Sequence, residues 1–175
     1  MNFQKLEQNI VDIVTEQQLK LGYRQEKVRI YYPLLSLNRL LGTDHDVARM
    51  KTALAAFRDR IKDRYGEIGI TEDNGRFCIL LPPVGNAYIH QCGADHVFLE
   101  ELIHRTGRHG CRIEEVLDLF RTYHAHIEKT DHGEFDYLAY FENGEPDHFR
   151  YCLTEEHDHV IYHRFTPEDY LDFAL

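Results

Sequence analysis

The stretch EIGITEDNGRFCILLPP, residues 67–83, has two short runs of alternating apolar residues on either side of a turn signal. The apolar residues are Ile68 and Ile70 before the turn, and Phe77, Ile79 and Leu81 after it. Between them, Asn74-Gly75 is typical of a two-residue hairpin turn, because both residues tolerate a positive φ. The stretch therefore predicts a β-hairpin with one apolar face.

Apolar spacing predicts the elements that precede this hairpin. These are a helix over 3–21, a short strand over 26–33, a compact helix over 34–41 and a long helix over 44–65. Helix, strand, helix, helix and hairpin over residues 3–81 resemble a winged helix, in which the hairpin is the wing. The resemblance concerns the order of the elements and no residue motif.

The second half begins with a helix pair, over 95–105 and 112–123, and then changes to strand patterns. Four strand-like segments follow, HAHIEK, FDYLAYFE, HFRYCLT and HVIYHRF, separated by turns that are acidic or contain glycine. A short helix over 166–173 ends the chain. We therefore predict an α+β fold with a winged-helix-like unit of three helices plus a β-hairpin over 1–85, and a helix pair with an antiparallel β-meander over 86–175. We expect the two to pack as one compact body, since no linker composition separates them.

The segment LKLGYRQEKVRIYYPLLSLNRLLGT, residues 19–43, resembles the start of a family of small bacterial proteins known only as a domain of unknown function. The resemblance runs over most of the chain. It implies one unit of about this length, and it brings no activity, cofactor or catalytic residue.

Charge is unevenly distributed along the 175 residues, whose formal net charge is −10. Residues 1–85 carry 13 Lys and Arg against 11 Asp and Glu, whereas residues 86–175 carry 7 against 19 and hold eleven of the twelve histidines. Because phosphates repel an acidic surface, the second half is a poor candidate for nucleic-acid binding. The start of the chain lacks the pattern of a secretion signal, and no apolar run is long enough for a membrane span, so we expect a cytoplasmic protein.

The stretch EEHDHVIYH, residues 155–163, raises the question of a metal site. His159 and His163 share one face of the expected strand, and His157 joins them if the strand begins early. His124 and His126 form a second H-x-H pair, and two such strands side by side would offer four imidazoles to zinc. The alternative is that these histidines line an acidic surface without binding a metal, and we favour it.

Cysteine and serine chemistry find limited support. The segment YIHQCGADH, residues 88–96, places Cys92 between His90 and His96, and a nearby imidazolium would promote the thiolate. The alternative is a polar loop that follows a strand. The chain has a single serine, Ser36, in an apolar helical run where a packing role is expected, and it has no glycine-rich phosphate loop.

The helix over 44–65 is where a winged helix would contact DNA. Its basic residues flank the apolar stripe; they are Arg49, Lys51, Arg58, Arg60, Lys62 and Arg64. The outward positions are small or acidic; they are Ala48, Thr52, Ala55, Asp59 and Asp63. Two acids at the outward pole disfavour phosphates, whereas small side chains let another helix approach, so a protein partner or a second copy fits better than DNA.

These observations together favour a cytoplasmic binding or regulatory module that acts through protein–protein contacts, with no cofactor and no recognisable catalytic site. Two alternatives stay open. One is a small enzyme that depends on a metal or on a cysteine, and the other is a DNA-binding winged-helix regulator.

Overall fold

The structure is a computed structural model that describes residues 1–93, 95–130 and 133–173. The chain divides into two compact units, Met1–Asp95 and His96–Leu175. The fold is α+β, as the sequence predicts, and both sheets are antiparallel. No described helix combines the length and the apolar composition that crossing a membrane requires.

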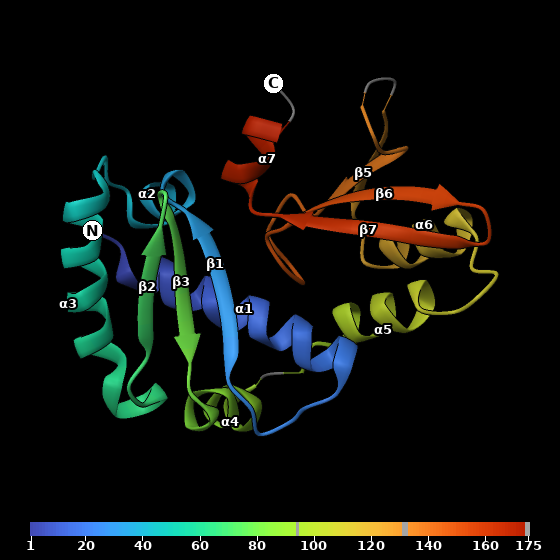
Figure 1. Cartoon of the computed structure of the whole chain (residues 1–175). Helices are drawn as coiled ribbons and strands as arrows, with labels where there is room; N and C mark the ends of the chain where they lie inside the picture. The colour runs from blue at the N-terminus through green and yellow to red at the C-terminus, as the bar shows by residue number, and fades with distance from the viewer. Residues whose placement is uncertain (94, 131–132, 174–175) are drawn as a thin grey trace. The chain divides into compact units, whose positions relative to one another are not determined.

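The N-terminal unit has the element order of a winged helix. Its elements are α1 (Phe3–Leu21), β1 (Val28–Pro33), α2 (Leu34–Leu41), α3 (Val47–Tyr65), β2 (Gly69–Asp73), β3 (Arg76–Leu81) and α4 (Pro83–Cys92). Two helices begin at capping side chains: Asn2 accepts from the backbone N–H of Lys5 at 3.1 Å, and Asp46 accepts from that of Arg49 at 2.8 Å. The strands pair in the order β1-β3-β2 (Figure 1), so the first strand adds to the predicted hairpin and makes it a three-stranded sheet.

The hairpin itself forms as predicted. Asn74 and Gly75 have φ values of 50° and 77°, the positive values that a tight two-residue turn requires. Across the sheet, Ile30, Ile79 and Ile70 stand opposite one another in register. Ile30 and Ile79 are fully buried, which places one face of the sheet in the core shared with α1, α2 and α3.

Helix α4 is the main departure from the sequence prediction, which places a loop there. Gly85 allows the close approach, because a Cβ at this position would lie 2.5 Å from Leu81 Cδ1 and 2.6 Å from the Tyr65 carbonyl oxygen. The buried Asn86 side chain donates to the backbone carbonyls of Arg24 and Glu26 at 2.9 and 3.1 Å. These contacts tie α4 to the N-terminal unit. Residue 85, where the sequence predicts the boundary between the two units, lies inside this helix.

The C-terminal unit contains the predicted helix pair and meander. Its elements are α5 (Val97–Thr106), α6 (Ile113–Thr122), β4 (His126–Lys129), β5 (Tyr137–Tyr140), β6 (Arg150–Glu156), β7 (His159–Phe165) and α7 (Pro167–Phe173). The strands pair in sequence order, β4-β5-β6-β7 (Figure 1). Each antiparallel strand thus lies beside its neighbour in the chain, as a meander requires.

The two faces of this sheet differ. On one face Tyr151 packs against Phe98 and Phe120, with ring centroids 5.7 and 5.2 Å apart, so α5 and α6 cover that side. Because side chains alternate along a strand, Cys152 and its register partner His163 lie on the opposite face. We call this second side the open face, meaning only the side opposite α5 and α6, since Cys152 on it is buried. It carries Arg150, Cys152, Thr154 and Glu156 from β6, and His159, Ile161, His163 and Phe165 from β7. That the two units form one compact body stays a prediction.

Candidate functional site

The histidines considered as zinc ligands are not brought together. His126 lies on β4 and His159 and His163 lie on β7, at opposite edges of the four-stranded sheet. Three strand spacings separate these edges, a distance of about 14 Å at ~4.8 Å per spacing. Imidazoles so far apart cannot share one zinc ion at metal–nitrogen distances of about 2 Å.

The other two histidines of the zinc hypothesis lie in turns. His124 and His157 have φ values of 58° and 50°, and both precede the strands that they were considered to extend. Across the described ranges, no group of three or more His, Cys, Asp or Glu side chains has a geometry that could hold a metal ion.

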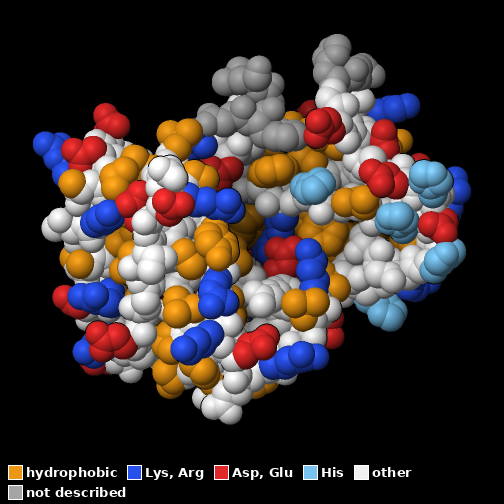
Figure 2. All heavy atoms as spheres, in the orientation of Figure 1, with side chains coloured by type: hydrophobic (Ala, Val, Ile, Leu, Met, Phe, Trp, Pro, Cys, Tyr) orange, Lys and Arg blue, Asp and Glu red, His pale blue; other side chains and the backbone are white. Residues whose placement is uncertain are grey.

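Several of the histidines are instead close to carboxylates on the surface of the C-terminal unit. His126 Nε2 lies 2.7 Å from Glu128 Oε1, and His109 Nε2 lies 2.6 Å from Asp158 Oδ2. His159 Nδ1 is 3.3 Å from the same Asp158 side chain. Figure 2 shows the pale blue histidine side chains of this view over the C-terminal unit. These contacts are those expected of histidines that line an acidic surface.

The surroundings of Cys92 differ from those that the sequence suggests. Cys92 is exposed, but it is the last residue of α4 and not part of a loop. His90, one of its two candidate activating groups, stacks on Tyr23 with ring centroids 4.0 Å apart and an interplanar angle of 4°. His96 belongs to the C-terminal unit, where it precedes α5. Ser36 is half-buried on α2, in keeping with packing.

The basic residues of α3 are largely held in ion pairs within the N-terminal unit. Lys51 Nζ lies 2.6 Å from Glu72 Oε2, and this contact is the largest of the causes that lower the pKa of Glu72. Lys62 Nζ lies 3.1 Å from Glu67 Oε2. Each of these lysines therefore has a carboxylate beside it, and a carboxylate repels phosphates, which weakens the case for DNA.

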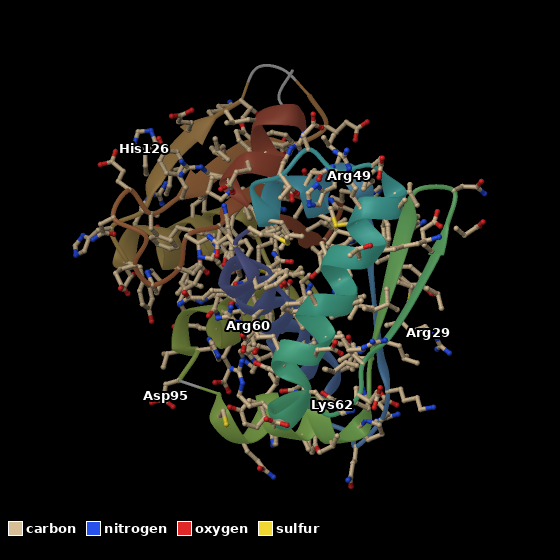
Figure 3. The ribbon with its side chains drawn as sticks, turned by 90° about the vertical axis from the view of Figure 1, so that its left-hand side faces the viewer. Arg29, Arg49, Arg60, Lys62, Asp95 and His126 are labelled. Atoms are coloured by element: carbon tan, nitrogen blue, oxygen red, sulfur yellow. The ribbon has the colours of Figure 1, made fainter. Side chains whose placement is uncertain are left out.

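Two further basic residues of α3 are paired in the same way. Arg64 Nη1 and Nη2 donate to the two carboxylate oxygens of Glu7 on α1, the second at 3.0 Å. Arg58 Nε lies 3.3 Å from Asp59 Oδ1. None of the ion pairs among the described residues involves Arg49 or Arg60. Figure 3 shows Arg49 near the start of α3, and Arg60 and Lys62 in its second half.

The outward face of α3 has small side chains in its first half and acids in its second half. Of the residues predicted to point outward, Ala48, Thr52, Asp59 and Asp63 are exposed, whereas Ala55 is half-buried and its neighbour Ala56 is exposed instead. Small side chains allow helix axes to come as close as about 8–10 Å. The small side chains in the first half of α3 would not hinder such an approach.

A pocket of about 270 Å³ opens on the open face of the C-terminal sheet. The part of its lining contributed by the strands consists of Cys152, Thr154 and Glu156 of β6, and Ile161, His163 and Phe165 of β7. Of these strand residues only His163 is a predicted candidate, and the pocket itself is not predicted from the sequence. The signal that could have found it is the alternation C-x-T-x-E followed by I-x-H-x-F, which places six side chains on one face once the hairpin register is known.

The chain belongs to the family described as a domain of unknown function, E. rectale gene description (DUF3877), whose model matches residues 3–174. The resemblance predicted from residues 19–43 is thereby confirmed. No curated protein and no solved structure matches the chain. The family match includes both compact units, so a single family unit comprises the winged-helix-like part and the meander together.

Proposed function

We propose that this protein is a cytoplasmic binding module that acts through protein–protein contacts, and that the outward face of α3 binds a second copy of the chain. The observation that carries the proposal is the distribution of charge on α3. Four basic side chains are paired inside the unit, one of them with Asp59, whereas Arg49 and Arg60 lie outside those pairs and the exposed acid Asp63 lies near the end of the helix.

This distribution suits two antiparallel copies of α3. In a two-fold pair centred between Ala55 and Ala56, the first half of one helix faces the second half of the other. Arg49 then faces the region of Asp63 of the second copy, next to the Arg58–Asp59 pair, and the symmetry repeats the contact. The small residues between them permit the close approach that these charge contacts need.

A DNA-binding role is less well supported by the same helix. Duplex DNA attracts proteins mainly through Lys and Arg that neutralise phosphates. The outward acids Asp59 and Asp63 would face the phosphates, and Glu72 and Glu67, which lie beside Lys51 and Lys62, would repel them as well.

Sedimentation equilibrium of the full chain over a wide range of concentrations tests the proposal. We expect a monomer–dimer equilibrium that weakens as salt is raised, since the contacts are charged and exposed. Arg49→Glu should weaken dimerisation by at least about tenfold, equivalent to about 1.4 kcal/mol. Combining it with Asp59→Arg and Asp63→Arg should restore the dimer, because the charges are then exchanged.

The matched control is Arg29→Glu, which makes the same change of charge at an exposed position on β1. We expect it to leave the association constant unchanged. A protein that stays monomeric at every concentration would refute the proposal. Salt-sensitive binding to random duplex DNA that is lost in Arg49→Glu would favour the DNA-binding regulator instead.

A further inference from the structure

The pocket on the open face is constructed by three separate segments of the C-terminal unit. In the β6–β7 register, Cys152 pairs with His163 and Thr154 pairs with Ile161, so these four side chains form two neighbouring rows. The third segment is the chain before β5, which supplies Glu134 and Phe135 to the lining. Thr154 Oγ1 donates to the Glu134 carbonyl oxygen at 3.2 Å and so attaches this segment to β6.

The base and the rim of the pocket have different chemistry. Cys152 is 1% exposed and forms the base, and Ile161, Phe135 and Phe165 are half-buried around it. Glu134, Glu156 and His163 are exposed and form the rim. An apolar interior with a few polar groups at one end is typical of small-molecule sites.

The charge at the rim is negative, and no Lys or Arg is among the described residues of the lining. Arg150 lies on the same face opposite Phe165 in the register, but its guanidinium stacks on Tyr140, with Cζ 3.7 Å from the ring centroid. The rim therefore presents two carboxylates and one imidazole above an apolar interior. The carboxylates attract cations by their charge.

Two carboxylates near the pocket, those of Glu155 and Asp136, form hydrogen bonds within the unit. Glu155 accepts from the backbone N–H of Ile113 at 2.8 Å and pairs with Arg112 at 3.0 Å, which fixes the start of α6. Asp136 accepts from the backbone N–H of Glu155 at 3.0 Å. Glu134 and Glu156, in contrast, form no side-chain ion pair or hydrogen bond with any other residue that the structure describes. Among the described residues, therefore, no Lys or Arg neutralises these two carboxylates.

We propose that this pocket binds a small organic cation, an ammonium group on an apolar body, with the ammonium between Glu134 and Glu156 and the apolar body against Phe135, Ile161 and Phe165. The size of the cavity limits the body to about that of one aromatic ring with a short chain. The site is on the C-terminal unit and is independent of the proposed function of α3.

The pocket is a binding site and not a thiol-dependent catalytic site. Burial raises the pKa of the Cys152 thiol to about 12, so the thiolate is not populated near neutral pH. A buried, protonated thiol is a poor nucleophile and behaves as a small apolar side chain. Cys152 therefore contributes to the apolar base of the pocket.

Binding is tested with phenethylammonium as the probe, followed by ¹H–¹⁵N correlation spectra of the full chain. Two analogues of similar shape serve as ligand controls, the neutral 2-phenylethanol and the anionic 3-phenylpropionate. We expect phenethylammonium to shift the amide signals of Thr154, Ile161 and His163 at millimolar concentration. The neutral analogue should bind about tenfold more weakly, and the anion should cause no shift, since each carboxylate contact is a charge-assisted hydrogen bond.

Three variants locate the site. The double variant Glu134→Gln/Glu156→Gln should abolish the preference for the cation over the neutral analogue, and Ile161→Trp should fill the pocket and prevent binding of both. Glu100→Gln, which removes an exposed acid on α5, is the control and should bind as the unmodified chain does. Equal affinity for the cation and the alcohol, or no shift at these three amides, would overturn the proposal. The spectra also report whether each variant remains folded.

Discussion

The buried hydrogen bond between Tyr32 and Asn9 provides a sharp test of the N-terminal core. Tyr32 Oη donates to Asn9 Oδ1 at 2.8 Å, and the two residues are 4% and 9% exposed. Tyr31, the adjacent residue, is on the other face of β1 and is 52% exposed. Tyr32→Phe and Tyr31→Phe therefore make the same chemical change on the two faces of one strand.

We expect Tyr32→Phe to lower the free energy of unfolding by about 1–3 kcal/mol, because it leaves the buried side-chain oxygen Oδ1 of Asn9 without this donor. Tyr31→Phe should change it by less than about 0.5 kcal/mol, as for most exposed positions. Urea denaturation followed by circular dichroism measures both. With a slope of about 2 kcal/mol/M, a loss of 2 kcal/mol lowers the midpoint by roughly 1 M.

A double-mutant cycle separates the hydrogen bond from the other contacts of Tyr32. Asn9→Ala removes the acceptor, so adding Tyr32→Phe to that variant should cost about 1 kcal/mol less than it does alone. If the effects of Asn9→Ala and Tyr32→Phe on the free energy of unfolding are additive, or if Tyr31→Phe and Tyr32→Phe are equally stable, this hydrogen bond does not stabilise the fold.

Three further measurements follow from packing and charge. With a thiol reagent at pH 8, exposed Cys92 should react in the folded protein, and buried Cys152 should react only on unfolding; rapid labelling of Cys152 would contradict its burial. The pKa of Glu115 is lowered by the Arg112 backbone N–H and by Arg108, so its stabilisation is present above the ordinary value of 4.5 and is lost as pH falls through the lower folded value. Urea midpoints should therefore fall less steeply below pH 4.5 in Glu115→Gln than in the unmodified chain, and identical slopes would count against the contact. Gly85→Ala should destabilise the fold by about 1–3 kcal/mol, because its Cβ has no room, whereas Gly93→Ala, at the residue that follows the same helix, should have little effect on the melting temperature.

Local sequence patterns are sufficient to predict most of the fold. The Asn74-Gly75 turn and the alternation on both sides of it identify the wing, since turn geometry and burial both depend on residues close in sequence. Helix α4 depends on distant residues. Its sequence contains Pro83 and Gly85, which suggest a loop, and what stabilises it is Asn86 bound to carbonyls about 60 residues away. A pattern within one window cannot contain that contact.

On the surface of α3, too, the sequence predicts some features and not others. The helical spacing alone places Asp59 and Asp63 at the outward pole, and the structure has both exposed. The ion pairs of the flanking residues are not predictable in this way, because Glu7 and Glu72 lie on α1 and β2 and approach α3 only after folding. The helix therefore has less free positive charge than its composition suggests.

The zinc hypothesis conflicts with the topology that the same sequence predicts. A meander pairs each strand with the next one in the chain, so its first and last strands are the two edges of the sheet. One group of histidines lies at the start of the first strand, and the other lies at the start of the last strand and along it, so only a closed barrel would bring the two groups together. The open four-stranded order β4-β5-β6-β7 excludes that contact. The same order makes β6 and β7 neighbours, and this is why His163 lies beside Cys152, at the edge of a pocket, and far from His126.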